Sequence, residues 1–184
     1  MNLSYSELEI LKNFIQFRDF EVCGTLVYIK GVVKPFIQAV GKSIDGRNAC
    51  IIPNEDRYIF HTHASTMKGY PSPEDILKVV KKKNPIKTSI VLTMWGIWEI
   101  SCIKKVNITK DMKNYLVNVI KQDSLGMYHV TEKGRKLSRQ VLPVVESFMN
   151  SVIHNVNRKI PVGLTMLFTP WNFIGKYGYN VKFS

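Results

Sequence analysis

The order of sequence patterns along the chain predicts the α/β or α+β class. A helical pattern comes first, strand-like runs follow, and then a second helix precedes further strand-like runs. Hydrophobic residues make up 45% of the chain and charged residues 22%, a globular composition that excludes a disordered or fibrous chain. With 184 residues, the chain is long enough to bury a core without disulfide bonds.

The first helix is predicted over residues 4–18. Ser4 and Glu7 form a capping-box pattern, and apolar residues recur behind them at helical spacing. Short apolar runs bounded by glycine, proline or polar clusters then predict strands. These runs are 22–30, 33–40, 50–53, 57–63 and 88–103, the last of which contains a turn near Gly96 and so counts as two strands.

The second helix is predicted to begin at Ser72, after a loop over residues 64–71. Serine is a good N-cap, Pro73 suits the first helical position, and acidic residues follow where the helix dipole favours them. Three lysines close the last turn, where the same dipole favours cations. Signals at both ends therefore define this helix.

Residues 106–184 carry patterns of their own. Thr109 is a candidate N-cap for a helix over 110–122. Residues 132–157 carry a helical apolar stripe, in which Pro143 marks either a kink or a new start. The last eight residues alternate between large apolar and small or polar side chains, which predicts a strand with one buried face.

All of the excess positive charge lies in the second part of the chain. Residues 1–80 hold nine basic and nine acidic residues, whereas residues 81–184 hold 17 basic and 5 acidic residues, a net charge of +12. Such an excess favours an acidic protein partner or a nucleic acid, or serves solubility alone. The candidate nucleic-acid contacts form a cluster that is otherwise a solvated helix face: Lys133, Arg135, Lys136 and Arg139.

The cysteines and the apolar runs bear on the compartment. Cys23, Cys50 and Cys102 are an odd number at no metal-like spacing, which argues against a disulfide scaffold and fits a reducing compartment. No secretory signal is recognisable at the start of the sequence. The longest uncharged stretch, residues 160–175, contains two prolines and is shorter than the ~20 apolar residues of a spanning helix. We therefore expect an intracellular protein, cytoplasmic or nuclear, without a membrane span.

Three metal-ligand side chains are grouped between residues 61 and 75. His61 and His63 lie two apart at the end of a predicted strand, so their imidazoles share one face. Asp75 lies in the first turn of the second predicted helix, where a carboxylate can complete a three-ligand set. Zinc sites with three protein ligands keep a fourth position for water and are catalytic. Glu21, at the junction of the first helix and first strand, is the candidate base for that water.

Each of these residues also has a simpler interpretation. Two histidines at this spacing are more often surface or core residues than ligands. Ser72 and Asp75 form an S-x-x-D capping box whatever else they do. Glu21 alone reads as a solvated charge at a helix end. The metal-site hypothesis therefore depends on the combination and its order.

This combination resembles the signature of the JAMM, or MPN+, metalloproteases. The signature E…H-[ST]-H-x(7–10)-S-x-x-D is met at every functional position, by Glu21, His61, Thr62, His63, Ser72 and Asp75. The sequence EVCGTL resembles the E-x-C-G-x-L around the glutamate of AMSH-type deubiquitinases. Ser89–Ile100 resembles the strand pair after the metal-binding helix. The resemblance covers about residues 1–105, and no family pattern is visible over 106–184.

The resemblance implies both a fold and a reaction. The fold is α/β, with an MPN (JAB/cytidine-deaminase-like) core of a mixed sheet flanked by helices over 1–105, and a basic α+β extension over 106–184 packed on it. One catalytic zinc ion (Zn2+) is expected on His61, His63 and Asp75. By the same resemblance, Glu21 activates the zinc-bound water and protonates the leaving amine, and Ser72 donates a hydrogen bond to the oxyanion. The expected substrates are lysine conjugates of ubiquitin or a ubiquitin-like protein.

Some features depart from the family pattern. Ala64 stands where many relatives have proline, and the H-N-H-P-S-G pattern of the RadC-like branch is not met. The remaining histidines and cysteines do not reproduce the second, structural zinc site of AMSH-type proteins. The alternative functions are a catalytically idle MPN-type scaffold and a nucleic-acid-associated binding protein. Idle scaffolds usually lack one or more ligands, and none is missing here.

Overall fold

A computed structural model describes residues 2–16, 20–30, 32–42, 57–63, 69–131, 142–174 and 178–180. Its strands are β1 (Asn2–Leu3), β2 (Phe20–Ile29), β3 (Val32–Lys42), β4 (Tyr58–Thr62), β5 (Thr88–Leu92), β6 (Gly96–Cys102), β7 (Leu164–Pro170) and β8 (Tyr179–Asn180). Its helices are α1 (Tyr5–Ile15), α2 (Pro73–Val80), α3 (Lys110–Thr131), α4 (Leu142–Lys159) and the 3-10 turn η1 (Trp171–Phe173).

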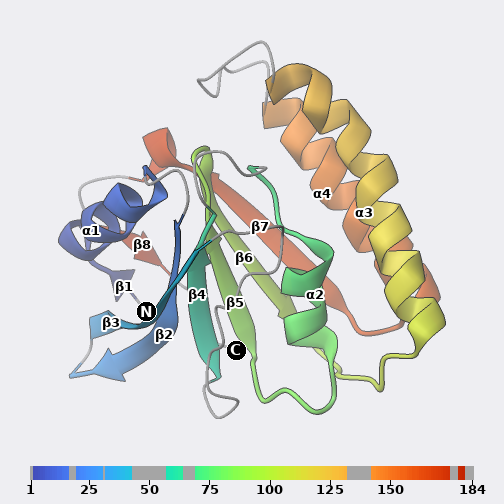
Figure 1. Cartoon of the computed structure of the whole chain (residues 1–184), viewed down its shortest axis with the longest axis horizontal. Coiled ribbons are helices and arrows are strands. Elements are labelled where there is room, and N and C mark those ends of the chain that lie inside the picture. Colours follow the sequence, from blue (N-terminus) through green and yellow to red (C-terminus); the bar gives the residue numbers. More distant parts are fainter. Residues whose placement is uncertain are drawn as a thin grey trace.

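The eight strands of the described residues form one mixed sheet, in the order β7-β6-β5-β4-β2-β3-β1-β8. β4 and β5 run parallel, as do β1 and β3, and the other neighbours are antiparallel. Helices lie on both sides of the sheet: α1 beside its β1–β3 part, and α2, α3 and α4 over β5–β7 (Figure 1). The α/β class with a mixed sheet flanked by helices is therefore confirmed.

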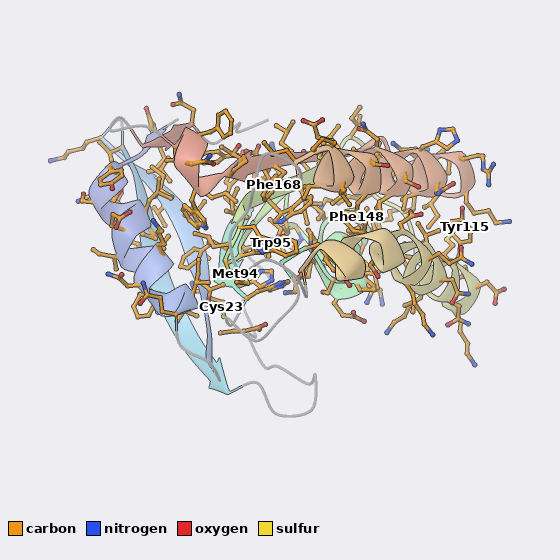
Figure 2. All side chains as sticks on the ribbon, turned by 90° about the horizontal axis from the view of Figure 1, so that it is seen from above. Cys23, Met94, Trp95, Tyr115, Phe148 and Phe168 are labelled. Carbon is orange, nitrogen blue, oxygen red and sulfur yellow. The ribbon has the colours of Figure 1, made fainter. Side chains whose placement is uncertain are left out.

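Each face of the sheet has its own hydrophobic cluster. On β6, Ile97 packs with residues of α1, whereas its neighbour Trp98 packs with residues of α2, α3 and α4. This division follows from the pleat, which turns successive side chains to opposite faces. Phe148 of α4 and Phe168 of β7 lie between the sheet and the α3–α4 pair (Figure 2).

Local end signals predicted the helix starts correctly. Ser4 caps α1 and Ser72 caps α2, each in a reciprocal capping box. The Thr109 hydroxyl accepts a hydrogen bond from the Met112 amide at 3.2 Å, so Thr109 caps α3 as expected. Pro143 lies at the second position of α4, so it marks a new start rather than a kink. The predicted strand 50–53 lies outside the described residues.

The region after residue 105 contributes a strand that the sequence did not predict. β7 pairs with β6 along its whole length, from Gly96↔Pro170 to Cys102↔Leu164. Side chains of α3, α4 and β7 share one cluster with α2 and β6. The domain boundary at residue 105 stays a prediction.

No helix in the described part of the chain is long and apolar enough to cross a membrane.

Candidate metal centre

β4 places both histidines on the α2 side of the sheet. Within the ladder, His61 pairs with Cys23 of β2 and with Val91 of β5. His63 follows the end of β4, and its amide donates to the Leu92 carbonyl at 2.8 Å, which continues the alternation by one residue. Since residues two apart in a strand share a face, both imidazoles point toward α2.

The capping box of α2 places Asp75. Asp75 Oδ2 accepts hydrogen bonds from the Ser72 amide and from the Ser72 hydroxyl, both at 2.8 Å. The chain leading to Ser72 is held by the Trp98 indole, which donates to the Gly69 carbonyl at 2.9 Å. A Cβ at Gly69 would lie 2.4 Å from the ring of Trp95, so only glycine allows this approach. The cap thus orients a carboxylate toward the histidines.

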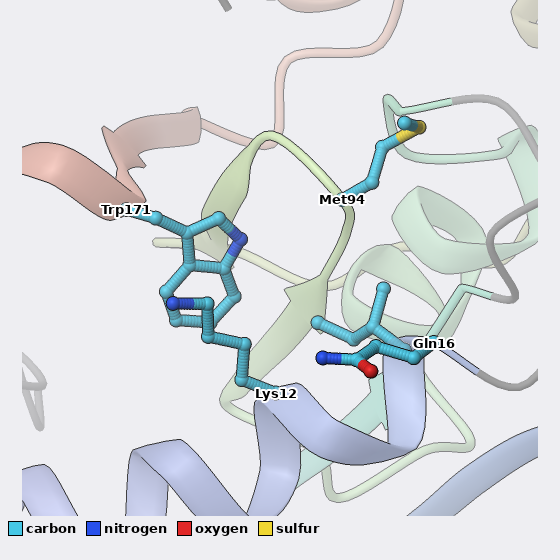
Figure 3. A pocket seen from close by; sticks show the side chains of 5 residues that line it. Lys12, Gln16, Met94 and Trp171 are labelled. Carbon is cyan, nitrogen blue, oxygen red and sulfur yellow. The ribbon is translucent and has the colours of Figure 1, made fainter. Parts of the chain in front are cut away.

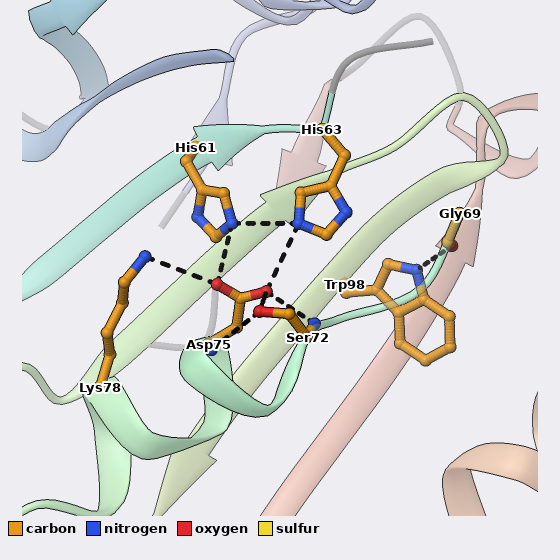
Figure 4. A network of polar contacts seen from close by, with 7 residues as sticks. All are labelled: His61, His63, Gly69, Ser72, Asp75, Lys78 and Trp98. Atoms are coloured by element: carbon orange, nitrogen blue, oxygen red, sulfur yellow. Dashed lines mark hydrogen bonds and ion pairs between the residues drawn. The ribbon is translucent and has the colours of Figure 1, made fainter. Parts of the chain in front are cut away.

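Three ligand side chains converge at this point (Figure 4). His61 Nε2 lies 3.0 Å from Asp75 Oδ1 and 3.3 Å from His63 Nε2, and His63 Nε2 lies 3.4 Å from Asp75 Oδ2. Tetrahedral ligands at the usual zinc distances are about 3.3 Å apart. The donor set and its spacing therefore fit a zinc ion, and the three side chains lie close enough together to hold a metal.

The electrostatics of the three residues also suit a metal. His61, His63 and Asp75 are only 2%, 4% and 2% exposed. Burial, the largest influence, lowers the pKa of His61 from 6.5 to about 4, so the ring is neutral at pH 7. Burial alone would raise the pKa of Asp75, but His61 and His63 hold it well below its usual value. A neutral imidazole and an ionised carboxylate are the forms that bind metal.

Lys78 is a charged neighbour of the site that sequence reasoning missed. Its ammonium lies 3.5 Å from Asp75 Oδ1, the same oxygen that faces His61. Lys78 follows Asp75 by three residues on α2, a spacing at which helical side chains meet. The contact between Lys78 and Asp75 could therefore have been predicted from the sequence once the helix was predicted. A resident cation at this carboxylate opposes the binding of a second cation.

β2 brings Glu21 to the same face as the histidines. Glu21 is 6% exposed, and extending the Cys23↔His61 register by two residues sets it opposite His63. The Val22 amide donates to the Thr62 hydroxyl at 2.9 Å, which holds this end of β2 against β4. Glu21 is thus buried beside the ligands, which removes its interpretation as a solvated helix-end charge.

Ser72 and Cys23 have definite partners in the structure. The Ser72 hydroxyl donates to Asp75, so it supports a ligand, and its role toward an oxyanion stays a prediction.

Cys23 is disulfide-bonded, whereas Cys102 carries a free thiol. The bond at Cys23 differs from the expectation of reduced cysteines, and it excludes Cys23 as a nucleophile while it is intact.

A separate pocket of about 210 Å³ lies between α1, η1 and the turn after β5 (Figure 3). Its lining residues are Lys12, Ile15, Gln16, Met94 and Trp171. The Lys12 ammonium lies 5.5 Å from the centre of the Trp171 ring, within cation–π range. Among the described residues, this lining contains no carboxylate, imidazole or thiol, so the metal-ligand group is the better candidate for metal-dependent chemistry.

No protein-family model and no curated protein matches this chain. Within the chain, the structure brings together His61, His63 and Asp75, with Ser72 bonded to the carboxylate. The predicted nucleic-acid cluster, Lys133, Arg135, Lys136 and Arg139, lies outside the described residues. The metal-ligand group and the motif that carries it are therefore the strongest indications of function in this chain.

Proposed function

We propose that this chain is a zinc-dependent peptidase of the JAMM type with an MPN-like core. Its proposed reaction is hydrolysis of the bond between ubiquitin, or a ubiquitin-like modifier, and a lysine. The observation that carries the proposal is the convergence of three buried ligand side chains, whose neighbouring nitrogen and oxygen atoms lie 3.0–3.4 Å apart, with a buried glutamate on the same face of the neighbouring strand. The JAMM-type order of these residues along the chain supports the same reaction.

In this proposal, His61, His63 and Asp75 hold the ion. Zinc at such a site lowers the pKa of water to about 7 and polarises a carbonyl oxygen. Glu21 takes the proton from the attacking water and returns it to the leaving amine, so one carboxylate serves as base and then as acid. Because Glu21 is buried, bulk water does not compete for its carboxylate.

Ser72 has two functions in the proposal. Its amide and hydroxyl both donate to Asp75 Oδ2. When negative charge develops on the substrate oxygen, the hydroxyl turns toward it, while the amide keeps its bond to Asp75. A hydrogen-bond donor to the oxyanion is worth roughly 10²–10³ in rate. The cap therefore supports the ligand and supplies the oxyanion donor from one residue.

A cleavage panel tests the proposal. Purified chain is incubated with di-ubiquitins of different linkage and with linear fusions of ubiquitin-like proteins, before and after chelation and after zinc is restored. The expected result is cleavage of at least one lysine conjugate, abolished by chelation and recovered with zinc. Stoichiometric zinc without cleavage of any conjugate would instead identify an idle scaffold.

A further inference from the structure

Three connecting segments at one end of the sheet are strongly basic. They are residues 81–88 between α2 and β5, residues 102–110 between β6 and α3, and residues 157–164 between α4 and β7. Together they contain nine basic residues and no acidic residue. In Figure 1 they lie at the lower ends of β5, β6 and β7, away from the His63 end of β4.

Backbone hydrogen bonds join the three segments into one surface. The Val106 amide donates to the Val80 carbonyl at 2.9 Å, and the Lys82 amide donates to the Val106 carbonyl at 2.8 Å. On the other side, the Lys104 amide donates to the Val162 carbonyl at 2.9 Å. The Lys105 ammonium turns inward, toward the carbonyls of residues 84 and 86. The outward-facing charges are therefore carried by backbone segments that hydrogen bonds hold together.

Three of the outward-facing lysines, Lys81, Lys82 and Lys83, line an open pocket of about 700 Å³. Its rim includes the Lys81–Lys83 run on one side and Val106–Ile108 on the other. The exposed basic residues of the three segments are Lys81, Lys82, Lys83, Lys104, Lys110, Arg158 and Lys159. We call this set the basic end. It offers many cations over a broad area, rather than one buried site for a small anion.

We propose that the basic end binds the phosphate backbone of double-stranded nucleic acid. Lysines supply the charge that phosphates need, and the exposed Asn107 and Thr109 supply neutral hydrogen-bond donors beside them. The three segments contain no aromatic residue. Single-strand binding relies on aromatic stacking, and membrane surfaces are commonly held by Trp or Tyr anchors, so a duplex fits this surface better than either.

The basic end is separated from the metal centre by the length of the strands. β4 and β5 begin at the basic end, whereas His63 and the N-terminus of α2 lie where these strands finish. Five residues of strand span roughly 17 Å. A duplex on the basic end therefore does not cover the end of the strands that carries the metal-ligand group, and the inference does not depend on the proposed peptidase activity.

Fluorescence anisotropy with a labelled 20-base-pair duplex tests the inference. The full chain is titrated at several salt concentrations, and Lys82→Glu/Lys83→Glu is compared with Lys34→Glu/Lys121→Glu. Both variants change the net charge equally, and all four side chains are exposed. We expect the Lys82/Lys83 variant to lose about tenfold or more in affinity and the log–log salt slope to become shallower by about 2. The Lys34/Lys121 variant should lose less than about threefold.

Several outcomes would overturn the inference. Equal losses in both variants would show that only net charge matters. A loss confined to Lys133→Glu/Arg135→Glu would move the contact to the cluster predicted from sequence. Binding to vesicles of phosphatidylserine, or to single strands, that is tighter than binding to the duplex would assign the surface to that ligand. Circular dichroism of each variant checks that the fold is retained.

Discussion

The two ends of β4 and β5 show opposite ways of using polar side chains. Where these strands finish, His61, His63 and Asp75 are buried and contact one another. Where the strands begin, the lysines of the basic end remain in water, whereas the neighbouring Lys105 ammonium donates to two backbone carbonyls. Burying charge is costly unless it is paired, so the first end needs exact partners and the second does not. The buried end should therefore respond sharply to single substitutions, and the basic end only to several.

Glu21→Gln should produce the largest effect at the buried end. It removes the proposed base and leaves the three ligands in place, so hydrolysis should fall by roughly 10²–10⁴ while zinc affinity changes little. Single-turnover cleavage and a zinc competition assay measure the two quantities separately. Wild-type hydrolysis by this variant would remove Glu21 from the reaction.

Acid should destabilise the metal-free protein through His61. Its pKa is about 4 in the folded chain and 6.5 as a free side chain, so between these values the unfolded chain binds more protons. Stability therefore falls as pH falls from about 6.5 to 4, by about 3 kcal/mol in total. Urea unfolding with a chelator present measures this fall. His61→Asn should flatten the profile, and His154→Asn, at an exposed histidine, is the matched control. A profile that stays steep in His61→Asn contradicts the assignment.

Thr62→Val should show that the position of Glu21 can be disturbed without loss of metal binding. The substitution leaves the buried Val22 amide without its acceptor, which costs about 1–3 kcal/mol of stability. The end of β2 that carries Glu21 loosens, so cleavage should slow while zinc affinity is kept. Thr62→Ser retains the hydroxyl and is the matched control. If both variants cleave equally, this hydrogen bond does not position Glu21.

Lys78→Met should give the smallest effect, and it should strengthen zinc binding, whereas the preceding substitutions weaken activity or stability. Removing the ammonium beside Asp75 Oδ1 removes a repulsion from the incoming cation, so zinc affinity should rise roughly threefold to tenfold. Lys81→Met, on the next turn and exposed, serves as control. Unchanged or weaker affinity in Lys78→Met would show that this lysine does not oppose the metal.

The sequence predicted what depends on local signals. The start of α2 followed from Ser72 and Pro73, and the cap that makes this start also orients Asp75, so the metal-ligand set could be predicted as well. Strand alternation was sufficient to place His61 and His63 on one face.

Contacts between distant segments could not be predicted in the same way. β7 pairs with β6 although more than sixty residues separate Ser101 from its partner Thr165. No local sequence pattern identifies which strand β7 will pair with. The bond between the Val22 amide and the Thr62 hydroxyl also joins residues forty apart. Lys78 is different, because the spacing of three residues on a helix is enough to bring it to Asp75, so this contact follows from local sequence alone.

The zinc content of the purified chain tests the central claim most directly. Metal-free protein is loaded with zinc, dialysed, and analysed by mass spectrometry alongside His63→Ala and Glu21→Gln, with circular dichroism to check the fold. We expect one zinc per chain in the wild type and in Glu21→Gln, and none retained in folded His63→Ala. Retention of one zinc by His63→Ala, or its absence from the wild type, would contradict the assignment of His61, His63 and Asp75 as a metal centre.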